Sequence, residues 1–274
     1  MSRGTYPVVL SIAGSDSGGG AGIQADLKTI SALGCFGTTA ITAITAQNTL
    51  GVTGIHPVPT ELVTAQIKAV MDDLRPAALK IGMVYSSALA TAIAEMLSEY
   101  PQIPVIFDPV MVTSSGDSLI KDQTVTTLKE QLFPLAELVT PNLEEASILA
   151  GFEVVAIPDM EKAARRLLQY GCNAVLIKGG HLAGSELCDF YLHKNGDARM
   201  FRSKKIETNN THGTGCTLSS AIASFRASGE DLVTAILKGK AYTHQAIEEG
   251  QHARTGAGHG PLNHFFDPQR LAVV

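Results

Sequence analysis

The sequence has no tryptophan, only 5% aromatic residues and only four cysteines. No two cysteines form a C-x-x-C pair, and their spacing does not match that of a structural zinc site. The opening residues lack the pattern of a signal peptide, and no apolar run is long enough to cross a bilayer. We therefore expect a cytoplasmic protein without membrane partners, whose thiols are reduced: Cys35, Cys172, Cys188 and Cys216.

The sequence also lacks an excess of basic residues. Lysine and arginine number 21 against 26 aspartates and glutamates, which gives a net charge of −5. No basic stripe interleaved with aromatic residues occurs, and this argues against a nucleic-acid partner. Hydrophobic residues make up 45% of the 274 residues, enough for a large core. Because no linker, repeat or low-complexity tract interrupts the chain, we predict a single domain over residues 1–274.

Two common phosphate-binding motifs are missing or incomplete. The chain has no G-x-x-x-x-G-K-[ST] sequence, so a Walker A loop is excluded. Residues 20–25 fit G-x-G-x-x-A, but a dinucleotide-binding fold then requires an acidic residue roughly 20 positions later. No aspartate or glutamate occurs between Asp26 and Glu61, and Gln47 stands at the expected position. This pattern argues against a nicotinamide-dependent dehydrogenase.

Short apolar runs alternate with amphipathic helical patterns along most of the chain. This alternation predicts an α/β fold with a mostly parallel sheet and helices in the crossovers. Thr60 is expected to cap one helix, and Asn195-Gly196 to form the turn of a hairpin. The expected strands are residues 8–13, 40–45, 78–81, 104–107, 138–139, 174–177, 187–192 and 199–203. The expected helices are residues 21–33, 142–150 and 159–170, one from residue 60, one through Leu89 and Leu97, one through Leu128 and Leu132, one from Gly215 and one over about 231–249.

Polar residues follow several of the predicted strands. Ligands of parallel α/β sheets bind at the carboxyl ends of the strands, so these residues should converge on one rim. Asp108, Asn142, Glu145 and Lys178 would supply carboxylates, an amide and a cation, a set that suits a nucleotide–magnesium site. Each has an ordinary explanation by itself: Asp108 could open a turn, Asn142 could cap a helix, and Lys178 could be solvated. Their shared position at one edge favours the functional interpretation. Other residues expected at this edge are Gly14, Asp16, Gln47, Asn48, Gly82 and Met83.

The segment Asn210-Thr-His-Gly-Thr-Gly-Cys-Thr217 precedes an apolar helix and is the strongest functional signal. The first N–H groups of a helix have no partner within the helix, and the helix dipole is positive there, so such a start attracts anions. Gly213 and Gly215 would expose these groups to phosphate. Cys216 would lie in the same positive field, which lowers a thiol pKa from about 8.5 and favours a thiolate that accepts a proton. The alternative interpretation is that Cys216 is a small buried side chain that packs in the core and has no catalytic role.

These motifs together resemble the hydroxymethylpyrimidine and phosphomethylpyrimidine kinases of thiamine biosynthesis, within the ribokinase-like superfamily. The resemblance runs from about Val8 to Phe266 and implies a ribokinase-like three-layer sandwich, with a mostly parallel central sheet flanked by helices. The motifs that carry it are residues 12–16, 18–28, 46–49, 80–83, 108–111, 140–146, 178–181 and 211–217.

The resemblance implies an activity and a set of roles. The activity is ATP- and Mg²⁺-dependent phosphorylation of 4-amino-5-hydroxymethyl-2-methylpyrimidine and of its monophosphate, in a homodimeric enzyme. The pyrimidine would bind Gly14, Asp26, Gln47 and Met83. The nucleotide would bind Asn142, Lys178, Thr211, Gly213 and Thr214, and the metal would bind Asp108 and Glu145. Cys216 would accept the proton, with Lys178, Gly213 and Gly215 completing the catalytic group.

Two alternatives remain open. A pyridoxal kinase of the same branch would use a similar anion site, but Gln47 favours an aminopyrimidine because a carboxamide both donates and accepts hydrogen bonds. A non-catalytic binder is disfavoured by the presence of Lys178, Asn142, Glu145 and Cys216.

Sugar kinases of the superfamily carry aspartate where this chain has Cys216. Residues 14–20 and 112–121 are expected to close over the site.

Overall fold

The structure is a computed structural model that describes residues 4–111, 122–180 and 186–273. The strands within these residues form one nine-stranded sheet, in the order β3-β2-β1-β4-β5-β6-β7-β8-β9. The sheet is parallel from β2 to β7, and antiparallel where β3 pairs with β2 and where β8 and β9 are added at the other edge. The strands are β1 (Val8–Asp16), β2 (Phe36–Asn48), β3 (Gly51–Pro57), β4 (Ala78–Ile81), β5 (Val105–Phe107), β6 (Leu138–Val139), β7 (Ala174–Ile177), β8 (Glu186–His193) and β9 (Ala198–Lys204).

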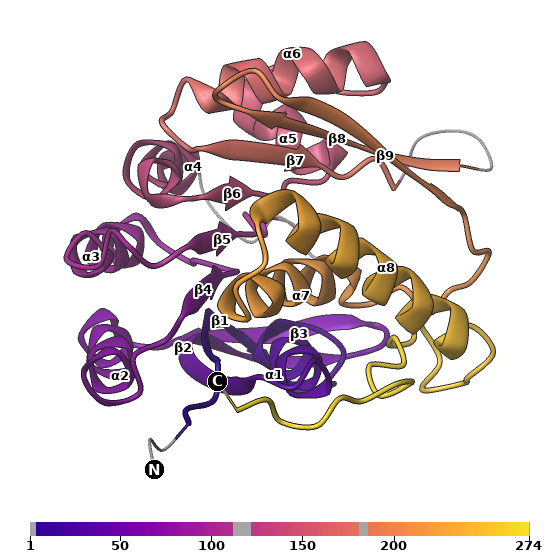
Figure 1. Ribbon diagram of the computed structural model, residues 1–274, viewed down its shortest axis with the longest axis horizontal. Helices are drawn as coiled ribbons and strands as arrows, with labels where there is room; N and C mark the ends of the chain where they lie inside the picture. Colours follow the sequence, from indigo (N-terminus) through magenta and orange to yellow (C-terminus); the bar gives the residue numbers. More distant parts are fainter. Residues whose placement is uncertain (1–3, 112–121, 181–185, 274) are drawn as a thin grey trace.

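Helices cover both faces of the sheet and complete a three-layer arrangement (Figure 1). One layer consists of α1 (Gly22–Ala32), α7 (Thr214–Ala227) and α8 (Leu232–Gly250). The other consists of α2 (Thr60–Asp73), α3 (Ser87–Leu97), α5 (Leu143–Ala150) and α6 (Ile157–Leu168). Beside α3, the short helix α4 (Asp122–Thr127) continues into a π-helical turn, Leu128–Leu132, and a 3₁₀ turn, Phe133–Leu135.

Alternation along the strands divides the core into two parts. Leu10 and Ile12 point into the cluster formed with α2 and α3, whereas Val9 points into the cluster formed with α7 and α8. Strands β4 and β7 are buried along their whole length because helices cover both of their faces. Burial of a large aliphatic side chain stabilises the fold by about 1.5–3 kcal/mol, so these strands hold the layers together. One residue of β4 breaks the apolar pattern, since Lys80 is also fully buried.

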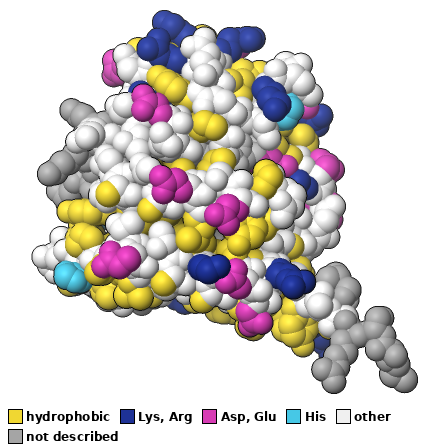
Figure 2. Space-filling view, turned by 90° about the vertical axis from the view of Figure 1, so that its left-hand side faces the viewer, with side chains coloured by type: hydrophobic (Ala, Val, Ile, Leu, Met, Phe, Trp, Pro, Cys, Tyr) yellow, Lys and Arg dark blue, Asp and Glu magenta, His cyan; other side chains and the backbone are white. Residues whose placement is uncertain are grey.

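Several local predictions are confirmed. Asn142 caps α5, and Gly151 ends it in the left-handed conformation with φ of 73°. Gly196, with φ of 93°, lies in the turn between β8 and β9 that the Asn-Gly pair predicts. The side of the molecule on which α2, α3 and α4 lie carries charged side chains interspersed with apolar ones (Figure 2). No helix among the described residues has the length and apolarity that crossing a membrane requires.

Other local predictions are wrong, and each error has a physical cause. Strand β3 was not expected, because this edge strand is half-exposed and contains two glycines and Pro57 instead of an apolar run. Thr60 is not a cap; the N-cap is Pro59, which has no side-chain acceptor. Leu128 and Leu132 belong to a π-helical turn and not to an α-helix. The loop expected over residues 14–20 begins inside β1, which extends to Asp16. Closure of residues 14–20 and 112–121 over the site stays a prediction, and residues 112–121 lie outside the described part of the chain.

Candidate active site

A cavity of about 820 Å³ opens at the carboxyl ends of the parallel strands, as the fold rule predicts. Strands β1, β2 and β4, the segments that follow β5, β6 and β7, and the start of α7 all contribute residues to its wall. Apart from Asp26, every residue expected to bind or catalyse lines this cavity: Gly14, Gln47, Met83, Asp108, Asn142, Glu145, Lys178, Thr211, Gly213, Thr214, Gly215 and Cys216. Asn48 and Gly82, which were also expected at this edge, do not line it. Sequence positions that are distant along the chain therefore converge on one space.

Helix α7 begins at the cavity with glycine backbone. Its N-cap, Gly213, has φ of 87°, a conformation that side chains disfavour, and no side chain caps the helix. A Cβ on Gly215 would lie 3.2 Å from Lys178 Nζ and 3.3 Å from Asp108 Oδ2. The lack of side chains thus lets a cation–carboxylate pair approach the helix start directly. First-turn N–H groups and a lysine at one place are suited to phosphate.

Lys178 and Asp108 form an ion pair at the ends of β7 and β5. Lys178 Nζ lies 2.7 Å from Asp108 Oδ1, and Thr140 Oγ1 donates a hydrogen bond of 3.0 Å to the same oxygen. Burial alone would raise the pKa of Asp108, but the charges of Lys178 and Lys80 outweigh it and lower that pKa. Burial also opposes the charge on Lys178, whereas Asp108 and Glu145 raise its pKa. Both groups are therefore charged at neutral pH.

Glu145 and Asn142 cap helix α5 reciprocally. The Asn142 side chain accepts from Glu145 N at 2.8 Å, and Glu145 Oε2 accepts from Asn142 N at 2.8 Å. Burial raises the pKa of Glu145 to about 7; Lys178 opposes this rise, and the negative charge of Asp108 adds to it. The capping interaction confirms the ordinary interpretation of Asn142, and the cavity-lining position leaves it available to a ligand as well.

The donor chemistry at this wall fits Mg²⁺ held jointly with a nucleotide. Among the described residues, no cluster of three or more His, Cys, Asp or Glu side chains could hold a metal ion by itself. Mg²⁺ commonly uses one or two carboxylates and takes its remaining ligands from phosphates and water. Asp108 and Glu145 offer carboxylate oxygens of that kind, and a bound cation would favour the ionised form of Glu145, whose pKa burial raises to about 7.

Cys216 lies in the first turn of α7, half-buried and facing the cavity. The expected lowering of its pKa is wrong for the ligand-free site. Burial raises the pKa of Cys216 to about 11; Lys80 opposes the rise, and the carboxylates of Asp26 and Asp108 add to it. The helix start alone suggested a thiolate, but surroundings contributed by distant segments determine the protonation state. The free enzyme holds Cys216 as a neutral thiol.

Asp26 lies beneath the cavity and not on its wall, which corrects the expectation that it lines the pyrimidine pocket. It is fully buried, and it accepts hydrogen bonds from Lys80 Nζ at 2.8 and 2.9 Å, Ser11 Oγ at 2.5 Å and Ser220 Oγ at 2.8 Å. Lys80 itself reaches the cavity floor. The one sequence signal of this pair is a lysine within an otherwise apolar strand.

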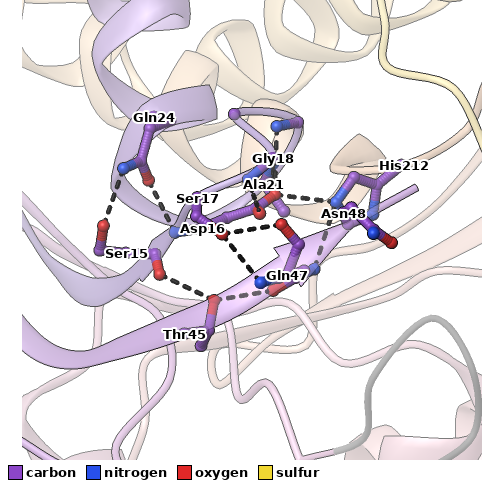
Figure 3. A network of polar contacts seen from close by, with 12 residues as sticks. Ser15, Asp16, Ser17, Gly18, Ala21, Gln24, Thr45, Gln47, Asn48 and His212 are labelled. Atoms are coloured by element: carbon purple, nitrogen blue, oxygen red, sulfur yellow. Dashed lines mark hydrogen bonds and ion pairs between the residues drawn. The ribbon is translucent and has the colours of Figure 1, made fainter. Parts of the chain in front are cut away.

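A second polar group ties the end of β1 to the start of α7 (Figure 3). Asp16 Oδ2 lies 2.9 Å from His212 Nε2, which in turn lies 3.3 Å from Gln47 Nε2. Burial would raise the pKa of Asp16, but the hydrogen bonds from His212, Ala21 N and Gly18 N outweigh it and lower that pKa. Both Asp16 and His212 lie within the motifs that carry the family resemblance, but the sequence alone indicates no role for either side chain.

Two further parts of the wall concern the shape of the cavity. A Cβ on Gly14 would lie 2.6 Å from Met83 Cε, so the glycine makes room for the methionine side chain. At the opposite end, the cavity continues between the loop 204–208 and the side chains of His244 and Ile247 on α8. Sequence reasoning missed this second end because its residues follow an antiparallel strand and belong to a helix surface, where the strand-end rule does not apply.

Comparison with known proteins decides the family. The sequence profile described as phosphomethylpyrimidine kinase matches residues 16–263. The chain belongs to this family. A hydroxymethylpyrimidine/phosphomethylpyrimidine kinase of Rhizobium meliloti is 49% identical over 259 residues, covering 94% of this chain and 97% of that protein.

Solved structures of family members and relatives share the fold. The phosphomethylpyrimidine kinase of Clostridium difficile is 42% identical with a TM-score of 0.78, and the match covers 88% of this chain and 99% of that one. The pyridoxal kinase of Bacillus subtilis, solved as an ADP complex, is 35% identical with a TM-score of 0.88, and the match covers 95% and 98%. The fold is therefore ribokinase-like, and the chain is a kinase.

Proposed function

We propose that this enzyme transfers the γ-phosphate of ATP to the hydroxymethyl oxygen of 4-amino-5-hydroxymethyl-2-methylpyrimidine, and then phosphorylates the monophosphate to the diphosphate. The supporting observation is that one cavity contains both an anion-binding site and a carboxamide side chain that can recognise a ring. Lys178 and the glycine-rich start of α7 form the anion site, and Gln47 lies on the wall near the end of β2. A carboxamide can donate to a ring nitrogen and accept from an adjacent amine.

The cavity suggests where each part of the substrates would bind. The nucleoside would occupy the end between the loop 204–208 and α8, and the phosphates would extend toward Lys178. Asp108 and Glu145 would hold Mg²⁺, which when bound supplies positive charge to the phosphate oxygens. The N–H groups that begin α7 would face the transferred phosphoryl group. Phosphoryl transfer has a loose transition state, so this placement and neutralisation of charge contribute most of the catalysis.

Cys216 would accept the proton of the attacking hydroxymethyl group. Because its pKa is about 11 in the free enzyme, the thiol would first release its proton to bulk water as the substrates bind, and the thiolate would then accept the hydroxymethyl proton. Lys80 is the nearby charge that favours the thiolate, and it lies at the cavity floor. A base that is mostly protonated in the free enzyme is compatible with a loose transition state, in which little bond formation to the attacking oxygen is required.

The second candidate activity is phosphorylation of pyridoxal or a related vitamin B6 alcohol. The structural match to the Bacillus subtilis pyridoxal kinase, which is 35% identical with a TM-score of 0.88, supports it. Gln47 favours the aminopyrimidine, since pyridoxal has no amine beside a ring nitrogen. Pyridoxal phosphorylation would then be a secondary activity of the same site.

A substrate panel tests the proposal. ADP release is measured by a coupled assay with the aminopyrimidine alcohol, its monophosphate and pyridoxal, each with and without Mg²⁺, and products are identified by mass. We expect Mg²⁺-dependent turnover of the two pyrimidines, with higher kcat/KM than for pyridoxal. A preference for pyridoxal would reverse the assignment. If none of the three compounds stimulates ADP release, both activities are refuted.

The assembly and location of the enzyme are also proposals. The family resemblance supports a homodimer of single-domain chains in the cytoplasm. Light scattering after size exclusion would distinguish the 28.8 kDa monomer from a particle of twice that mass. A single cooperative unfolding transition in a calorimeter would support one domain, whereas two resolved transitions would contradict it.

A further inference from the structure

A chain of hydrogen bonds surrounds the carboxamide of Gln47 (Figure 3). On one side, His212 Nε2 lies 3.3 Å from the amide nitrogen of Gln47 and 2.9 Å from Asp16 Oδ2. On the other side, Thr45 Oγ1 lies 3.1 Å from the amide oxygen and donates to Ser15 O at 2.9 Å. Oxygen and nitrogen of an amide are nearly equal in size, so their positions follow from the hydrogen bonds that the neighbouring groups allow.

The proton of His212 can be assigned from the surroundings of Asp16. The Asp16 carboxylate accepts backbone hydrogen bonds from Gly18 at 2.7 Å, Gly20 at 3.1 Å and Ala21 at 2.8 Å. Three N–H donors favour the ionised carboxylate, in agreement with its lowered pKa. A carboxylate without a proton can only accept, so His212 Nε2 must carry the hydrogen and donate it to Asp16.

This assignment conflicts with an amide nitrogen facing His212. A protonated Nε2 has no lone pair to accept from the Gln47 nitrogen, so two donors would face each other at 3.3 Å. A matching conflict occurs at Thr45, whose single hydroxyl hydrogen cannot be donated to both Ser15 O and the Gln47 oxygen. Exchanging the oxygen and nitrogen of Gln47 removes both conflicts without moving any other atom.

We propose that Asp16 and His212 are positioning residues that hold the Gln47 carboxamide with its oxygen toward His212 and its nitrogen toward Thr45. In this orientation, the Thr45 hydroxyl donates to Ser15 O and accepts from the Gln47 amide. His212 Nε2–H is shared between Asp16 and the Gln47 oxygen. One N–H and one lone pair of the carboxamide remain on its outer edge, and this edge faces the cavity.

The orientation determines which way round a substrate binds, a consequence that rests on the proposed function. In the aminopyrimidine, the amine lies between a ring nitrogen and the carbon that carries the hydroxymethyl group. A Gln47 oxygen on the His212 side places the amine on that side, and the hydroxymethyl group beyond it, toward the start of α7. The reverse orientation would direct the hydroxymethyl group toward Thr45, away from Cys216. The network therefore selects the productive binding mode.

The glycine loop after β1 makes the network possible. A side chain on Gly20 would overlap the His212 ring, and one on Gly213 would overlap the carbonyl of Gly20. These glycines allow the loop and the start of α7 to approach until His212 reaches Asp16. The loop is also fixed from outside, because Lys28 Nζ donates to Gly19 O at 2.6 Å. Its glycines thus position a substrate-recognition side chain.

NMR of the ligand-free protein tests the orientation directly. The side-chain amide signal of Gln47 is identified by its loss in Gln47→Glu, and nuclear Overhauser effects from its two protons are then measured in the unsubstituted protein. We expect stronger effects to the Thr45 methyl group than to the carbon-bound protons of the His212 ring. The opposite ranking would overturn the proposal. This measurement needs no substrate, so it stands even where the substrate panel refutes the proposed function.

Kinetics tests the positioning role. His212→Leu removes the donor, and we expect KM for the aminopyrimidine to rise by roughly two- to tenfold, the range for one net hydrogen bond, with KM for ATP unchanged. His212→Gln, which can return an N–H near the same place, should recover most of the loss. His252→Leu, at an exposed position outside the cavity wall, is the matched control. An unchanged KM in folded His212→Leu would refute the role.

Where that variant does not fold, Thr45→Val carries the test. This substitution removes the acceptor of the Gln47 amide nitrogen and should raise the KM for the aminopyrimidine.

Discussion

The Lys80–Asp26 ion pair lies beneath the active site. We expect the loss of one partner to destabilise the fold strongly, and the loss of both partners together to cost much less. Both side chains have no exposed surface, and Lys80 Nζ contacts both carboxylate oxygens at 2.8 and 2.9 Å. Replacing Lys80 with methionine keeps the length of the side chain but leaves Asp26 as an unpaired buried charge. Breaking a buried ion pair in this way costs about 3–5 kcal/mol of unfolding free energy. We expect Lys80→Met to lose that amount.

The second substitution separates the charge from the packing. In the double variant Lys80→Met with Asp26→Asn, no net charge remains, and the asparagine can still bond to Ser11 and Ser220. Replacement of both partners of a buried pair is commonly close to neutral. The double variant should therefore be more stable than Lys80→Met alone, with a coupling free energy of roughly 2 kcal/mol between the two positions.

Urea unfolding followed by circular dichroism at pH 7 gives the required free energies. The matched control is Lys68→Met, because the Lys68–Asp72 pair on α2 has side chains 67% and 52% exposed. That substitution should change the unfolding free energy by less than about 0.5 kcal/mol. A Lys80→Met protein within about 1 kcal/mol of the unsubstituted enzyme would refute the reasoning. So would a double variant in which the two losses simply add.

Three further predictions concern the cavity wall. Cys216→Ala should lose more kcat than Cys216→Asp, because a carboxylate can accept the hydroxymethyl proton and a methyl group cannot; equal activity of Cys216→Ala and the unsubstituted enzyme would remove the base assignment. Lys178→Ala should lower kcat/KM by about a hundredfold or more, the usual effect of removing one group that stabilises transition-state charge, and a loss under about tenfold would contradict its role. Glu145 has a pKa of about 7 in the fold against 4.5 as its ordinary value, so the folded state holds the proton more tightly and stability falls as pH rises through that window. Glu145→Gln keeps the cap, and its Tm without Mg²⁺ should exceed that of the unsubstituted enzyme by more at pH 8 than at pH 5; a pH-independent difference would contradict the burial argument.

The parallel centre of the fold was predictable because its signals are local. Strand β7 is a short apolar run, and β4 is one apart from Lys80; both faces of each strand are covered, so the sequence shows no regular polar alternation there. Helix α5 has its cap, its reciprocal glutamate and its terminal glycine in consecutive positions. The edge strand β3 has no such signal, since it pairs on one side only and half of its surface is solvated. Its pairing follows from the position of β2, which is a tertiary property.

The active site was predictable in position but not in depth. The strand-end rule places Asp108, Glu145 and Lys178 at one rim, and the structure brings them together. The same rule cannot say whether a residue on α1 faces the cavity or lies beneath it. For Asp26, the answer depends on Ser11 from β1, Lys80 from β4 and Ser220 from α7, which enclose it from three elements.

The protonation of Cys216 and the role of the glycine loop show why local signals mislead at this site. A thiol at a helix start predicts a low pKa, but burial together with carboxylates from other elements reverses the sign. A run of glycines after a strand predicts a phosphate loop or a lid. At position 20, however, only glycine fits, because the ring of His212 occupies the space that a side chain would need. In both cases the deciding neighbour is brought there by the fold. Local patterns in this chain therefore identify which residues matter, and the tertiary contacts determine what each of them does.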